Sequence, residues 1–234
     1  MSVKRRIVSI FLFCGSFLFL SGCTEIMQNL VPRRDPPPPV EITKPDEAYV
    51  SPNLDFNQIS ALGIFPIFPG EIQNDVFADA FSRVLNAELQ TKQSQWKIIL
   101  PSELVGQINQ KGFGRGYKNL QADMNTFSGA TGFGAMTQET KNFLQDLDNV
   151  TGANSYLLGV YSIRREKKIE RSVFGPMEIT FIVCKVKIIL YQINKGIMWD
   201  ATHTVETESN IENNADVLGK AFASYLGKGT LRQL

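Results

Sequence analysis

The chain contains 234 residues, of which 24 are Lys or Arg and 23 are Asp or Glu. The first 22 residues hold three of the basic side chains and no acidic one, so the remainder carries 21 basic and 23 acidic side chains. This balance excludes the strong basic excess of a nucleic-acid-binding domain. The stretch after residue 50 has the length of one domain with its own hydrophobic core.

The N-terminus has the three-part order of a secretory signal. A basic start, Lys4–Arg6, precedes the apolar run Ile7–Leu20 and two small residues. The apolar run has 14 residues, fewer than the ~20 that a membrane-spanning helix needs. The motif Leu20-Ser21-Gly22-Cys23 resembles the lipobox of bacterial lipoproteins. The resemblance implies cleavage between Gly22 and Cys23 and a lipid on the Cys23 sulfur. The alternative is an ordinary cleaved signal followed by a chance cysteine.

Residues 23–50 are expected to form a lipidated, proline-rich tether that leads to a periplasmic domain at residues 51–234. The run Pro36–Pro39 favours extended polyproline II structure, which rises ~3.1 Å per residue and buries no core. Thr24 follows the cysteine, and the absence of Asp at this position favours the periplasmic face of the outer membrane over the inner membrane. The short tether confines the domain to the vicinity of the membrane surface.

The first half of the domain alternates strands and helices. Residues 59–67 are mainly apolar and predict a buried strand, whose end Pro66 marks. Residues 75–92 repeat apolar side chains at helical spacing and predict an amphipathic helix. Residues 96–100 predict a second strand, and Ser102 is expected to cap the short helix that follows.

Residues 112–137 interrupt this pattern. They contain six glycines and three phenylalanines, Phe113, Phe127 and Phe133, among polar residues. We expect a long glycine-rich loop here, and long loops in compact domains are often functional. The three aromatic side chains make it a candidate interaction loop. Its glycines match neither a phosphate-binding loop nor a dinucleotide-binding motif, so no nucleotide cofactor is expected.

The second half predicts a helix followed by a strand meander. Residues 140–150 have helical periodicity, and Gly152 is expected to end that helix. Residues 155–163 and 178–193 predict strands, and the even-numbered positions of the second strand form an apolar face. The charged residues 164–171 are expected to connect the two strands.

A tight turn at residues 194–196 leads into a strand with two distinct faces. Its apolar face is expected to hold Ile197, Trp199, Ala201, His203 and Val205. A helix over residues 217–226 ends the domain. The order of elements predicts an α/β fold, with a mixed sheet of about five strands and helices packed on its apolar face.

Three stretches resemble the periplasmic α/β domain shared by the TolB N-terminal domain, the penicillin-binding-protein activator LpoB and the curli secretion lipoprotein CsgG. They are Leu62–Leu89 with the following Gln95–Leu100, then Thr151–Gly159, and then Ile193–Trp199. The resemblance implies this fold and a role in docking an envelope partner, or in a homo-oligomeric complex. The connection 164–178 is interpreted as too short for the long hairpins with which CsgG builds its pore.

The sequence contains no catalytic or metal-binding motif. Its one histidine, His203, is expected to pack in or beside a strand, since no motif supplies the partners of a catalytic triad or a zinc site. Cys184 lies in an apolar strand and is expected to be a core residue. Accordingly we expect no enzymatic activity, no cofactor and no disulfide within the domain.

The leading hypothesis is a membrane-anchored, non-catalytic module that docks an unidentified envelope protein. Docking would use the sheet face, a sheet edge or the loop at 112–137. The alternative is a homo-oligomeric component of an outer-membrane secretion or assembly complex. A third hypothesis, a hydrolase or small-ligand binder, requires an apolar pocket with converging polar groups. No nucleic-acid partner is expected.

Overall fold

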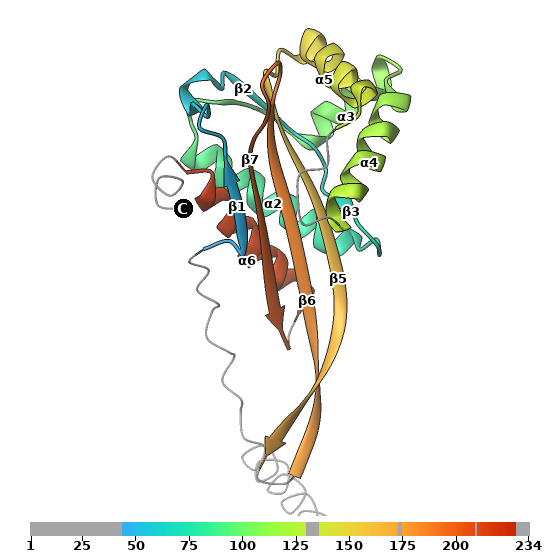
Figure 1. The fold of residues 1–234 in the computed structure, drawn as a ribbon, viewed down its shortest axis with the longest axis vertical. Coiled ribbons are helices and arrows are strands. Elements are labelled where there is room, and N and C mark those ends of the chain that lie inside the picture. The colour runs from blue at the N-terminus through green and yellow to red at the C-terminus, as the bar shows by residue number, and fades with distance from the viewer. Residues whose placement is uncertain (1–43, 130–135, 173–174, 209, 228–234) are drawn as a thin grey trace, which may run out of the picture. The chain divides into compact units, whose positions relative to one another are not determined.

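The computed structural model describes residues 44–129, 136–172, 175–208 and 210–227. The predicted signal segment, the Gly22–Cys23 cleavage site and most of the predicted tether lie outside these residues. The described chain is a mixed α/β domain, in which a seven-stranded sheet carries helices on both faces (Figure 1). The predicted fold class is confirmed, with more strands than expected and with two apolar faces in place of one.

The elements follow one another in a simple order. They are β1 (Glu47–Val50), the 3-10 turn η1 (Phe56–Gln58), β2 (Ala61–Ile64), β3 (Phe68–Pro69), α2 (Asp75–Lys92), β4 (Lys97–Ile99), α3 (Pro101–Gln110), α4 (Gly114–Gly129), α5 (Gln138–Thr151), β5 (Ser155–Ser172), β6 (Gly175–Gln192), β7 (Gly196–Thr207) and α6 (Ile211–Tyr225). The strand order is β1-β7-β6-β5-β2-β4, and β3 pairs with β5 beside β2. The pairs of β2 with β4 and β5 are parallel, whereas β5, β6, β7 and β1 pair antiparallel.

The alternation of side chains along β5 and β6 supplies two hydrophobic cores. In the first core, Leu157 and Tyr161 of β5 pack with α2 and α6. In the second core, Leu158 and Val160 pack with α3, α4 and α5. Successive side chains of a strand point to opposite faces, so one strand can serve both cores. Cys184 lies in the first core with no exposed surface, as predicted, and burial raises the pKa of its thiol.

Local sequence explains several helix ends. α2 has the predicted bounds, and the Asn74 side chain caps it by accepting a hydrogen bond from the Phe77 N–H at 2.9 Å. Gly152 ends α5 with a φ of +70°, as predicted, because glycine adopts this left-handed conformation without strain. The predicted cap at Ser102 is wrong. Helix α3 begins with Pro101 and has no side-chain cap, since proline has no N–H to satisfy at that position.

The predicted loop at residues 112–137 is wrong for most of its length. Residues Gly114–Gly129 form helix α4, whose buried Leu120 and Met124 face the second core. At Gly116 a Cβ atom would lie 2.5 to 2.8 Å from three atoms of Phe143 on α5. The missing side chain therefore allows α4 and α5 to approach closely, and this glycine marks helix packing where the sequence suggested a loop.

The charged residues 164–171 are strand, not a connection. They continue β5, which pairs with β6 without interruption from Ser155↔Gln192 to Ser172↔Gly175. This part of β5 belongs to neither core, so its side chains need no apolar alternation, which is the signal used to predict strands. A long hairpin is therefore present at the place where the sequence was interpreted as too short for one.

The structure also differs from the prediction at β1 and at the start of β7. Residues Glu47–Val50, predicted as tether, pair with β7, so the folded domain begins before residue 51. Ile197 packs against the second core, whereas Trp199 lies in the first. The cause is a register shift opposite Leu190 and Tyr191, because a β-bulge moves the following side chain to the other face of a sheet.

The close contact between α4 and α5 predicts the effect of adding a methyl group. Gly116→Ala is expected to destabilise the domain by roughly 1–3 kcal/mol, since the added Cβ overlaps Phe143 in a packed core. Gly114→Ala is the matched control, because no atom lies within 4 Å of its added Cβ. Urea unfolding followed by circular dichroism measures both variants, and equal stabilities would contradict this packing.

Candidate functional site

The residues of the predicted interaction loop are not gathered on one described loop. Cys23, Gly22 and Phe133 lie outside the described residues, and Phe127 lies within α4. Phe113 is partly buried against the second core, with its ring edge-on to that of Phe143 at a centroid distance of 6.2 Å. Phe113 therefore has a packing role in the second core.

A two-stranded ribbon extends past the rest of the sheet (Figure 1). We define the ribbon as residues 166–172 of β5 and 175–181 of β6. Strand β7 pairs with β6 only as far as Ile182↔Thr207, so the seven residue pairs beyond it contain β5 and β6 alone. At ~3.3 Å per residue the ribbon is about 23 Å long. Two strands alone bury little apolar surface and are marginally stable in water.

One face of the ribbon combines an apolar row with a charged row. Following the alternation from the second core, Phe181, Ile179 and Met177 of β6 share this face with Glu166, Lys168 and Glu170 of β5. The Lys168 ammonium lies 4.9 Å from the centroid of the Phe181 ring and forms an ion pair with Glu206 of β7. Nearer the tip, 43% of the Met177 surface is exposed, so the apolar row ends in contact with water.

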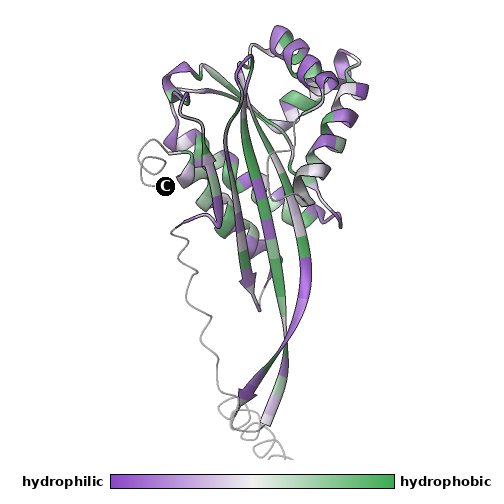
Figure 2. Cartoon of the chain, viewed as in Figure 1, coloured by the Kyte–Doolittle hydropathy of each residue, from purple (hydrophilic) through white to green (hydrophobic). Residues whose placement is uncertain are grey.

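The other face is mostly charged. It holds Lys167, Ile169 and Arg171 of β5 beside Glu178 and Thr180 of β6, and Arg165 directly precedes them on the same face. Lys167 and Glu178 form an ion pair at 2.5 Å, and the hydrogen bond to Glu178 raises the pKa of Lys167. Ile169 lies among these charges with 74% of its surface exposed. Figure 2 shows the distal part of β5 as a hydrophilic stretch beside a less polar β6.

Local sequence does not predict the β5 half of the ribbon, because the charged run of β5 lacks apolar alternation. A second signal was available in the partner strand, where Met177, Ile179 and Phe181 alternate with Glu178 and Thr180. That pattern predicts a strand whose start lies close to residue 176. A strand that starts so soon after residue 171 leaves room only for a tight turn, and a tight turn brings the preceding residues alongside as a partner.

His203 is buried on β7 and packs as predicted. Its Nδ1 lies 3.3 Å from Oδ1 of Asp46, which precedes β1, and its ring is edge-on to that of Tyr225 on α6. Burial lowers the pKa of His203, and the negative charge of Asp46 opposes this effect. Burial also raises the pKa of the Tyr225 hydroxyl. The histidine therefore lies between the start of the folded domain and its last helix.

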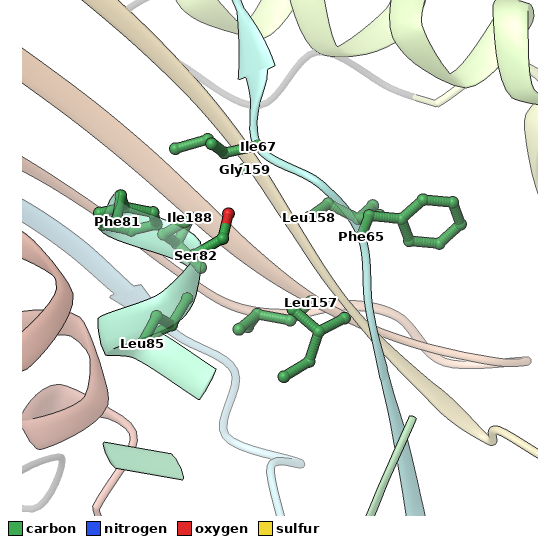
Figure 3. Close-up of a pocket in the computed structure, with 10 residues that line it drawn as sticks. Phe65, Ile67, Phe81, Ser82, Leu85, Leu157, Leu158, Gly159 and Ile188 are labelled. Atoms are coloured by element: carbon green, nitrogen blue, oxygen red, sulfur yellow. The ribbon is translucent and has the colours of Figure 1, made fainter. Parts of the chain in front are cut away.

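A narrow pocket lies between α2 and the sheet, over Gly159 (Figure 3). Apolar side chains of β2, α2, β5 and β6 line it, and the Ser82 hydroxyl is the single polar side-chain group among them. The glycine leaves this space open, since a Cβ there would lie 2.6 Å from Ile188. One hydroxyl does not provide the converging polar groups that a hydrolase or ligand site requires.

No cluster of His, Cys, Asp and Glu side chains among the described residues has the size of a metal site. None of the described helices combines the length and the apolar character that crossing a membrane requires.

No protein-family model matches the chain, and no curated protein matches it. Solved structures give weak similarity. A PelC dodecamer from Paraburkholderia phytofirmans is 14% identical with a TM-score of 0.40, over 74% of this chain and 91% of that chain. The LpoB C-terminal domain from Salmonella enterica is 12% identical with a TM-score of 0.33, over 63% of this chain and 83% of that chain. A hypothetical protein from Chlamydia trachomatis is 13% identical with a TM-score of 0.32, over 74% and 88% of the two chains. Similarity at this level assigns neither a family nor a function to the chain.

The buried histidine predicts a pH dependence of stability. Because the folded-state pKa of His203 is lowered, the unfolded chain binds its proton more readily. The free energy of unfolding therefore keeps its full value above about pH 6.5, the pKa of histidine in the unfolded chain. It declines as the pH falls from there toward the pKa of His203 in the folded chain. His203→Gln is expected to lose less thermal stability than the wild type between about pH 7.5 and about pH 5.5.

Asp46→Asn provides the matched comparison, because it removes the carboxylate that stabilises the protonated ring. This variant is expected to lose more stability than the wild type over the same pH range. Differential scanning calorimetry at a series of pH values measures all three proteins. Identical pH profiles for the wild type and His203→Gln would exclude His203 as the group responsible.

Proposed function

We propose that this chain is a lipid-anchored, non-catalytic interaction module of the cell envelope, and that the ribbon is its docking element. The observation that carries the proposal is the ribbon itself. It places exposed apolar side chains, Ile169 and Met177, outside both cores, with backbone edges that no described strand covers. Exposed strand edges and apolar side chains on a projecting element are features to which other proteins add.

The membrane anchor in this proposal rests on the sequence. The signal segment and the lipobox-like motif at Cys23 support lipidation, and Thr24 supports the periplasmic face of the outer membrane. The Asp46 N–H already bonds to Thr202 of β7, and β1 begins at Glu47, so we take the tether as residues 24–45. Fully extended, such a segment spans at most ~80 Å. Partners within this distance of the membrane are therefore the ones that the domain would reach.

Lipidation is tested at its single acceptor. Cys23→Ala is expected to leave an unprocessed precursor without lipid, because the thiol is the acceptor and its modification precedes cleavage. Metabolic labelling with a fatty acid, combined with gel mobility and membrane fractionation, measures each step. A Cys23→Ala protein that is still mature in size, labelled and bound to the outer membrane would exclude this anchor.

Docking through the ribbon is tested with exposed apolar residues. Ile169→Asp is expected to reduce cross-linking of the full chain to its partner in envelope preparations by about tenfold, because a charge replaces an apolar contact at the interface. Val150→Asp is the matched control, since Val150 is an exposed apolar residue of α5, away from the ribbon. Both variants should unfold at the wild-type temperature. Equal loss of cross-linking in both would remove the ribbon from the proposal.

A further inference from the structure

The ribbon has two free edges. On the β5 side, β3 pairs only with Val160 and Tyr161, so β5 from Ser162 onward has no described strand beside it. On the β6 side, β7 ends its pairing at Ile182, so residues 176–181 have no described strand beside them either. β1 covers β7 only up to Thr202, and Asp46 lies against His203, so residues 204–206 of β7 also have no described strand on their outer side, one strand further out than β6. Each edge presents unpaired backbone groups that another strand can bond.

The direction of the free backbone groups follows from bonds in the body of the domain. The Tyr161 carbonyl accepts a hydrogen bond from Gly70 on the β3 side, at 2.7 Å. Backbone groups alternate in direction along a strand, so the odd-numbered residues of β5 direct theirs away from β6. The Thr202 carbonyl accepts from Asp46 in the same way. The even-numbered residues of β7 therefore direct their backbone groups toward β1, and the odd-numbered residues direct theirs toward β6. Since the odd-numbered residues of β7 pair with even-numbered residues of β6, the backbone groups of Pro176, Glu178 and Thr180 point away from β5, toward the free edge.

The two edges have opposite charge. Residues 162–172 of β5 contain five basic and two acidic side chains. The opposite edge, residues 176–181 of β6 and 204–206 of β7, contains the acidic Glu178 and Glu206 and no Lys or Arg. The ion pairs of these two carboxylates with Lys167 and Lys168 lie at the surface, where exposed pairs exchange partners readily. One edge of the chain is therefore complementary to the other edge of the same chain.

We propose that the partner at the ribbon is a second copy of this chain, which associates head to tail. The β5 edge of one copy pairs with the β6 edge of the next. When the hairpins of the two copies point the same way, β5 of one copy runs antiparallel to β6 of the next, as these strands do within each hairpin. A two-fold arrangement of β5 against β5 would bring five basic side chains against five others, which like-charge repulsion disfavours. Head-to-tail contacts are heterologous, so they extend to further copies.

This inference names the partner in the proposed function and rests on it for the ribbon's docking role. The first test removes one outward N–H. Thr180→Pro deletes a backbone donor at the free edge without removing a bond between β5 and β6, and strand edges tolerate proline where the N–H faces water. Pro176 already occupies the same side of the strand. Thr180→Val is the matched control, because it keeps the N–H and a β-branched side chain.

Sedimentation velocity of the detergent-solubilised full chain measures the association over a range of concentrations. The wild type and Thr180→Val are expected to self-associate, and Thr180→Pro is expected to do so at least about tenfold more weakly. If Thr180→Pro has a lower unfolding temperature, the double variant Arg165→Glu, Arg171→Glu replaces it, since reversing these charges makes the β5 edge acidic. A wild type that stays monomeric, or a Thr180→Pro or double variant that associates as strongly as the wild type, would overturn the inference.

The second test determines the direction of pairing. Arg165→Cys places a thiol on the β5 edge, and Glu178→Cys places one on the β6 edge. With a bifunctional maleimide, head-to-tail pairing gives cross-linked dimers only when the two variants are mixed. A two-fold contact would instead give dimers with one variant alone. The unsubstituted chain, whose Cys184 is fully buried, provides the background.

The two experiments separate this inference from the proposed function. Envelope cross-linking that depends on Ile169, together with a strictly monomeric chain, would overturn self-association and leave docking to another protein in place. A monomeric chain whose envelope cross-linking does not depend on Ile169 would overturn the inference and the proposed function together.

Discussion

The structure depends on the pairing of β5 with β6. These two strands of 18 residues each stay in one antiparallel register along their whole length. β2 and β7 add to the two sides of the pair, and the alternation of its side chains supplies both hydrophobic cores. The helices on each face have a continuous apolar surface to cover because this central pair is long and unbroken in the body of the domain.

The same pairing continues where no helix covers it. In the ribbon, the backbone bonds between β5 and β6 persist, but the side chains no longer have a core to enter. Charged residues and Pro176 on the edges are features that limit uncontrolled strand addition, whereas the exposed Ile169 and Met177 offer apolar contact. The ribbon therefore combines solubility with an exposed binding surface, and this combination suits an element that meets a specific partner.

Buried polar groups in the body serve the architecture. Asp123 of α4 accepts hydrogen bonds from the backbone N–H and the hydroxyl of Thr137, at 2.8 and 2.9 Å, and so joins α4 to the start of α5. The Tyr161 hydroxyl accepts from the Asn74 N–H at 2.7 Å and so links β5 to the cap of α2. The His203 ring contacts Tyr225 of α6, and its Nδ1 lies 3.3 Å from Asp46 at the start of the domain. These polar side chains therefore connect elements that are separate in the sequence.

The sequence by itself determined the elements whose signals are local. Helical spacing gave the bounds of α2, glycine at residue 152 gave the end of α5, and apolar alternation placed Cys184 in a core, because each of these signals depends on neighbours in the chain. The anchor at Cys23 is likewise a local motif and remains a prediction from the sequence.

Only the tertiary structure decided the rest. Gly116 suggests a loop until Phe143 of another helix is seen against it, and Ile197 changes face because of a bulge opposite a different strand. The ribbon is the clearest case. Its β5 half has no apolar pattern, since it belongs to neither core, and it is a strand because β6 supplies its hydrogen-bond partners. Pairing between strands is an interaction between separate segments, so the candidate docking surface became visible only in the folded chain.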